Sequence, residues 1–111
     1  MEVYNKLVRD NIADIINNNG KGEIAITKTL EEQEYKKELL KKLQEEFLEL
    51  IEAVTDGIKE NIIEESADLI EVIRALNQDD LDNVLSKLEE KRNKKGGFTK
   101  RLYLEKVIKV K

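Results

Sequence analysis

Apolar residues recur every three or four positions through the middle of this chain, which is the spacing of one face of an α-helix. Two long helices are predicted there, at about 31–55 and about 61–76. Gly57 lies between them and suits the left-handed turn that often follows a helix. A third helix should begin near Asp79, which with Asp80 supplies the carboxylates that a helix N-terminus favours. The predicted fold class is therefore all-α, a helical bundle.

The two ends of the chain carry weaker patterns. Apolar residues between Leu7 and Ile16 recur at helical spacing and predict a first helix, which the run Asn-Asn-Asn-Gly at 17–20 ends. Residues 23–30 alternate in polarity, so they form either an extended connector or a single edge strand. After the turn signal Gly96-Gly97, the tail is predicted to be extended or weakly β. We expect one domain over residues 1–111, with short extended segments at both ends.

Acidic residues interrupt the apolar faces of the two long helices. Glu46 falls inside the apolar arc of the first helix, and Glu49 lies just beyond its edge. Glu65 falls inside the apolar stripe of the second helix, and Asp68 lies at its margin. Carboxylates are rarely buried unless they are paired or bound to a metal. The apolar positions are Leu39, Leu43, Phe47, Leu50, Ala53 and Val54 on the first helix, and Leu69, Val72, Ile73 and Leu76 on the second.

Side-by-side packing of these helices would bring four carboxylates into one small volume, where they repel one another at neutral pH. A hard divalent cation, Mg²⁺ above all, is the natural occupant of a site made only of oxygen atoms. The alternative is a solvated charged face, since 40% of the residues are charged. That alternative accounts well for Glu45 and Glu52, but poorly for Glu46 and Glu65 on their apolar faces.

Composition narrows the chemistry further. The chain has no cysteine and no histidine, which excludes disulfides, thiol nucleophiles and imidazole catalysis. A net charge of −4 disfavours general nucleic-acid binding. No apolar run is long enough to cross a membrane, and no leader pattern opens the chain, so we expect a cytoplasmic protein.

Two groups of cations could hold a phosphate chain. Lys94, Lys95 and Arg101 flank the glycine pair, and Lys6 and Arg9 lie three positions apart near the start of the chain. Lysine and arginine donate charge-assisted hydrogen bonds to phosphate. The alternative for the cations near residue 95 is a solvated helix end that balances the helix dipole. The sequence leaves both interpretations open.

The pattern Glu-Glu-x-x-Glu, followed after a gap by Glu-x-x-Asp, resembles that of the all-α nucleoside triphosphate pyrophosphohydrolases, the MazG-like superfamily. The sequence Tyr-Asn-Lys-Leu-Val-Arg-Asp at 4–10 and the Gly-Gly-Phe at 96–98 are similar to a small subgroup called phosphoribosyl-ATP pyrophosphohydrolase-like. Asn11 and Ala13 stand where that subgroup favours lysine and proline. Those two departures affect how the first helix begins more than they affect the residues expected to carry the reaction.

The resemblance implies Mg²⁺-dependent cleavage of a nucleoside triphosphate between its α- and β-phosphates, in a nucleotide house-cleaning role, with Mn²⁺ as the alternative ion. It implies that Glu46, Glu49, Glu65 and Asp68 hold the metal, and that Glu45 or Glu49 orients the attacking water. It also implies a homodimer or a dimer of dimers. The competing hypothesis is a non-catalytic helical module for oligomerisation or nucleotide sensing. The complete set of acids favours the enzyme, and no residue indicates a preferred base.

Overall fold

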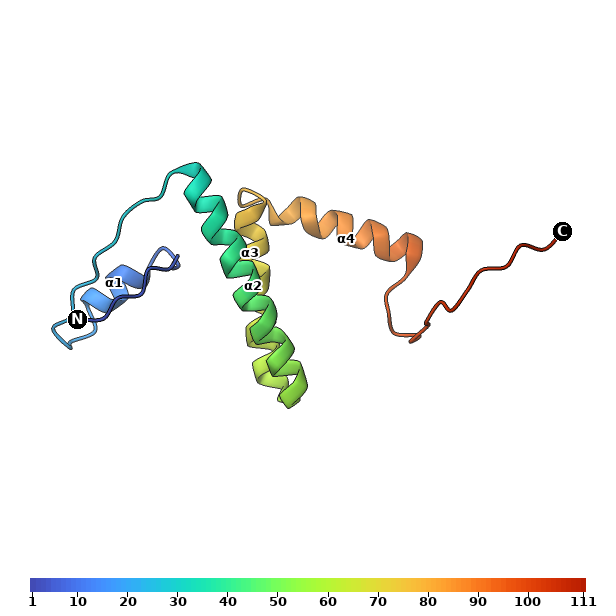
Figure 1. Ribbon diagram of the computed structural model, residues 1–111, viewed down its shortest axis with the longest axis horizontal. Coiled ribbons are helices and arrows are strands. Elements are labelled where there is room, and N and C mark those ends of the chain that lie inside the picture. The colour runs from blue at the N-terminus through green and yellow to red at the C-terminus, as the bar shows by residue number, and fades with distance from the viewer. The chain divides into compact units, whose positions relative to one another are not determined.

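The computed structural model describes residues 1–111 and contains four helices and no strand. The all-α class is thereby confirmed, and residues 23–30 form a connector rather than a strand. The chain divides into two compact units, Met1–Asp79 and Asp80–Lys111, which are described separately. The helices, labelled in Figure 1, are α1 at Ile12–Asn17, α2 at Glu32–Asp56, α3 at Lys59–Leu76 and α4 at Leu81–Lys95.

Helices α2 and α3 form an antiparallel hairpin (Figure 1). As predicted, Gly57 closes α2: its φ of 76° is a left-handed conformation that glycine adopts without steric strain. Its N–H donates to the carbonyl of Ala53 at 3.0 Å, which satisfies one of the free carbonyls at the end of the helix. Because α3 then begins at Lys59, the chain reverses within two residues. The buried apolar side chains are Leu39, Ala53 and Val72, all from the predicted apolar faces of this pair.

The apolar arc predicted for α2 is only partly buried. Leu39 and Ala53 are covered, whereas Phe47 is 54% exposed. Phe47 belongs to a second apolar stripe, which lies roughly 100° around α2 from the buried one. A hairpin of two helices covers one stripe on each helix and leaves the neighbouring stripe open. The exposed stripe, here called the outer stripe, consists of Leu40, Phe47, Ile51 and Val54.

The first helix is shorter than predicted. It begins at Ile12, so residues 7 and 8 precede it and do not form its first turn. Asp10 and Asn11 make a turn in which the N–H of Ile12 donates to the carbonyl of Arg9 at 3.1 Å. Short polar side chains such as these compete with helical backbone bonds and favour turns, which explains the later start.

The second unit comprises α4 and the C-terminal tail. Asp80 caps α4, since its carboxylate accepts a hydrogen bond from the N–H of Asn83 at 3.1 Å. The helix thus begins two residues after Asp79, which lies just before the cap with a φ of 69°. The tail beyond Gly96 contains no strand. None of the four helices combines the length and the apolarity that a membrane crossing requires.

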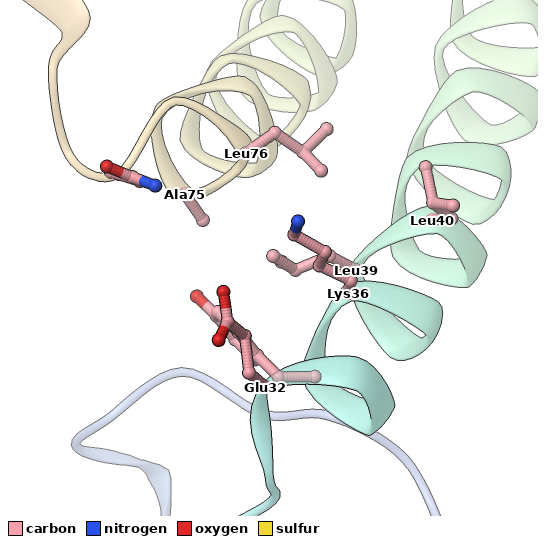
Figure 2. Close-up of a pocket in the computed structure, with 8 residues that line it drawn as sticks. Glu32, Lys36, Leu39, Leu40, Ala75 and Leu76 are labelled. Atoms are coloured by element: carbon pink, nitrogen blue, oxygen red, sulfur yellow. The ribbon is translucent and has the colours of Figure 1, made fainter.

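A pocket of about 210 Å³ lies at the open end of the hairpin, between the start of α2 and the end of α3 (Figure 2). Leucine side chains from both helices give it apolar walls, and Tyr35 adds an aromatic ring. Leu39 in its wall precedes Glu46 by seven residues, or about 10 Å of helix. The pocket is therefore separate from Glu46. Its lining is Glu32, Tyr35, Lys36, Leu39, Leu40, Ala75, Leu76 and Gln78.

Candidate metal centre

Three glutamates converge on the seam of the α2–α3 hairpin. Carboxylate oxygens of Glu46, Glu49 and Glu65 all lie within 4.8 Å of one another. Glu46 and Glu49 are three positions apart and share one side of α2. The antiparallel course of α3 then brings Glu65 opposite them. We call these three residues the glutamate cluster.

Two members of the glutamate cluster carry oxygen atoms that lack partners. Glu46 and Glu65 are half-buried, and the Oε2 atom of each is shielded from solvent and accepts no hydrogen bond. A buried carboxylate oxygen without a partner is costly, more so when the group is charged. Glu49 is exposed and can turn toward either of them or toward solvent. The hairpin by itself therefore leaves the cluster unsatisfied.

The crowding of the carboxylates changes their proton affinity. Burial raises the pKa of Glu46 from its ordinary 4.5 to about 7; the hydrogen bond that a protonated Glu46 can donate to Glu49 and the charges of Glu49 and Asp68 act in the same direction. For Glu65, the hydrogen bond that its protonated form can donate to Glu49 is the main cause of a raised pKa, followed by burial. The charge of Lys42 opposes the shift at Glu46. Near neutral pH the cluster therefore favours holding a proton wherever no cation compensates its charge.

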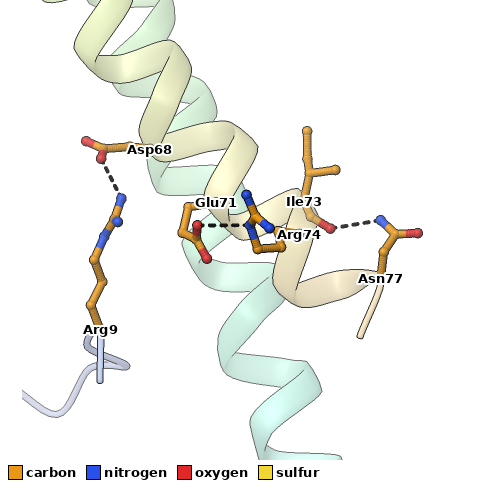
Figure 3. Close-up of polar contacts among 6 residues, drawn as sticks. All are labelled: Arg9, Asp68, Glu71, Ile73, Arg74 and Asn77. Atoms are coloured by element: carbon orange, nitrogen blue, oxygen red, sulfur yellow. Dashed lines mark hydrogen bonds and ion pairs between the residues drawn. The ribbon is translucent and has the colours of Figure 1, made fainter. Parts of the chain in front are cut away.

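Asp68 lies beside the glutamate cluster but has a partner of its own. Its Oδ1 atom accepts a hydrogen bond from Nη2 of Arg9 at 2.8 Å (Figure 3). The two side chains are 40% and 60% exposed, respectively. The structure thus brings three of the four predicted metal ligands together and pairs the fourth with a guanidinium group.

Among the remaining predicted site residues, Glu45 and Lys6 lie outside the cluster. Glu45 is exposed and lies 3.4 Å from the Nζ atom of Lys42. The ammonium group of Lys6 lies over the ring of Tyr4, 5.5 Å from its centre. The cations near residue 95 belong to the second unit: Lys94 and Lys95 end α4, and Arg101 follows in the tail.

Sequence reasoning missed the role of Lys42. The charge of Lys42 opposes the rise in the pKa of Glu46, and its side chain is only 24% exposed. Its position four residues before Glu46 carried the signal, because residues at that spacing are neighbours on a helix surface.

Comparison with known proteins assigns the chain to a family. The family model of phosphoribosyl-ATP pyrophosphohydrolase matches residues 15–92. The chain belongs to this family. The match contains both long helices and all four predicted metal ligands, so the resemblance noted in the sequence is confirmed, and the chain is a hydrolase that acts on a phosphoanhydride bond of nucleotides. No curated protein and no solved structure matches the chain.

The donor set fits the divalent metal that such hydrolases typically use. All the donors are carboxylate oxygens, which hard cations prefer. The 4.8 Å span of the cluster is close to the distance between opposite oxygens around one such ion, about 4–5 Å. The two unpartnered Oε2 atoms would gain the partner that the protein does not supply.

We expect the metal-free protein to lose stability as the pH rises from 4.5 to about 7. In this window Glu46 keeps its proton in the folded state and loses it in the unfolded state, so the folded state binds more protons and a rise in pH favours unfolding. Glu46→Gln should remove this contribution and raise the free energy of unfolding above neutral pH. Because the cluster is partly solvated, the gain should be on the order of 1 kcal/mol.

Denaturant titrations with a chelator, repeated across this pH range, measure the effect. Glu52→Gln is the matched control, because Glu52 lies on the same helix and is exposed. Equal pH profiles for the two variants would show that the repulsion does not centre on Glu46.

Proposed function

We propose that the protein is a Mg²⁺-dependent nucleoside triphosphate pyrophosphohydrolase that yields a nucleoside monophosphate and pyrophosphate. The observation that carries the proposal is the convergence of Glu46, Glu49 and Glu65, with two oxygens unpartnered, in a member of a pyrophosphohydrolase family. The all-oxygen donor set favours Mg²⁺, or Mn²⁺, over softer ions. When bound, such an ion neutralises phosphate charge and lowers the pKa of a water molecule.

The side chains of the cluster then take different roles. Glu46 and Glu65 hold the ion through their shielded oxygens, and Asp68 completes the set. Glu49 is exposed, so it can orient a water molecule as general base. We favour Glu49 over Glu45 as that base because Glu45 lies outside the cluster, 3.4 Å from Lys42.

The substrate class is the nucleoside triphosphates, and the role is house-cleaning of the cytoplasmic nucleotide pool. The absence of histidine and cysteine supports direct attack by water, since the usual covalent intermediates on those residues are impossible.

Pyrophosphate release should require both the metal and the glutamate cluster. A panel of nucleoside triphosphates, with phosphoribosyl-ATP included, should release pyrophosphate with Mg²⁺ and not with a chelator. Glu65→Gln should lower Mg²⁺ affinity and turnover by at least the roughly 10- to 100-fold that the loss of a metal's outer-shell partner produces. The exposed Glu52 provides the control, as Glu52→Gln should retain activity. Nucleotide binding without pyrophosphate release would contradict the proposal and favour a sensing module.

We also propose that the chain forms a homodimer or a dimer of dimers. The outer stripe of α2 supports this, because four large apolar side chains remain about half exposed on one side of the helix. Helix α3 adds Ile63 and Ile70, at 59% and 45% exposure. Apolar surface of this extent is typical of an interaction surface. A second hairpin packed on the outer stripe would make a four-helix arrangement that buries it.

Light scattering at micromolar concentration should therefore find a dimer or a tetramer. Phe47→Glu should shift the protein toward monomer, because it places a charge in the middle of the outer stripe. Ile24→Glu is the control: Ile24 is 80% exposed on the connector, away from both long helices. A wild-type protein that stays monomeric would overturn the proposed assembly.

Lys94, Lys95 and Arg101 are proposed to contact the phosphate chain. The support is their proximity in sequence across a glycine pair, where Gly96 takes a φ of 83° that permits a sharp change of direction. Each could donate a charge-assisted hydrogen bond to a phosphate oxygen.

Replacing these three residues with alanine should raise the KM for the nucleotide and leave Mg²⁺ affinity without nucleotide unchanged. Each lost contact should cost about 1.5–3 kcal/mol if it is shielded from water. Steady-state kinetics read beside melting temperatures would measure this. An unchanged KM with a small loss of stability would show that the cations only balance the end of α4.

A further inference from the structure

The N-terminal segment reaches α3 through a long-range ion pair. Arg9 and Asp68 are 59 positions apart in the sequence, and their side chains meet at 2.8 Å (Figure 3). The other four ion pairs of the structure join residues three positions apart. The contact between Arg9 and Asp68 therefore does not follow from their being neighbours on one helix, as it does for the other pairs.

The pair of Arg9 and Asp68 is important for its position beside the glutamate cluster, and less for its contribution to stability. Asp68 follows Glu65 by one helical turn, and its charge acts on Glu46. The guanidinium group of Arg9 is always protonated, so it is a fixed positive charge at the edge of the glutamate cluster. Both partners are substantially exposed, and ion pairs of that kind add little to stability. Arg9 is thus a counter-ion that another cation can replace.

We propose that Arg9 is an exchangeable counter-ion of the metal centre. In the free protein it neutralises Asp68. When a divalent ion occupies the metal centre, Asp68 turns to that ion. The released guanidinium then binds the phosphate chain of the nucleotide, for which its planar fork of donors is suited. This inference rests on the proposed function and deepens it, because it gives Arg9 two partners in succession, first Asp68 and then the phosphate chain.

The exchange makes the two ligands cooperative. Arg9 competes with the metal for Asp68 in the free protein, and a nucleotide that holds Arg9 removes this competition. Each ligand should therefore increase the affinity for the other, and the coupling should pass through this one side chain. A purely structural role, in which Arg9 only ties the N-terminal segment to α3, predicts no such coupling.

The test is calorimetric titration of Mg²⁺ alone into wild type, Arg9→Ala and Arg9→Lys. Arg9→Ala should bind Mg²⁺ about two- to fivefold more tightly, the factor that corresponds to an exposed ion pair. Arg9→Lys should stay near wild type because it keeps the charge. At saturating Mg²⁺, Arg9→Ala should raise the KM for the nucleotide more than it lowers kcat.

Arg74→Ala is the matched control. Arg74 pairs with Glu71 at 3.3 Å on α3, and the two side chains are 39% and 43% exposed (Figure 3). Removing Arg74 therefore breaks a similarly exposed ion pair that does not include a predicted metal ligand. The rise in melting temperature on adding Mg²⁺ should be larger in Arg9→Ala than in Arg74→Ala. Unchanged or weaker Mg²⁺ binding by Arg9→Ala, in a wild type that binds Mg²⁺ and releases pyrophosphate, would overturn the exchange and leave the proposed function intact. A wild type that binds no Mg²⁺ and releases no pyrophosphate would overturn both.

Discussion

Repulsion between carboxylates in the seam of the α2–α3 hairpin is the interaction on which the rest of the structure depends. The seam is the place where apolar side chains would hold the two helices together most strongly, and Glu46 and Glu65 occupy part of it. Only three apolar side chains, Leu39, Ala53 and Val72, are buried to support the pair. The chain therefore gives up apolar packing at the point where the glutamate cluster lies.

Two cations of the first unit, Lys42 and Arg9, lie at the margin of the glutamate cluster. Lys42 lies 3.4 Å from Glu45, and Arg9 lies 2.8 Å from Asp68. Neither satisfies the shielded oxygens of Glu46 and Glu65. A guanidinium or ammonium group is larger than a divalent metal ion. The small ion can bind several carboxylate oxygens at once. The proposed metal site requires this arrangement, in which the cationic side chains lie at the margin and the unpartnered oxygens lie at the centre.

The parts of this arrangement that depend on local sequence could be predicted, and the parts that depend on distant contacts could not. Helical periodicity placed Glu46 and Glu65 on the apolar faces of their helices. The repeat of 3.6 residues per turn is enough to say which residues share a face. The same periodicity did not show that Phe47 is exposed, since the width of the buried stripe depends on the partner helix. It gave no sign either that Arg9, 59 positions earlier in the chain, contacts Asp68, because local sequence does not fix a contact at that separation.

The outer stripe and Glu49 lie on different sides of α2, so the proposed assembly surface and the proposed catalytic residue do not overlap. At about 100° per residue, Glu49 lies roughly 140–180° around the helix from every residue of the outer stripe. A partner that covers Phe47 and its neighbours would therefore approach from the side away from Glu49. The exposed carboxylate, and Asp68 beside the cluster, would remain open to a nucleotide. Burial of the outer stripe would also strengthen the hairpin that the carboxylates weaken, so the proposed assembly would support the site without occupying it.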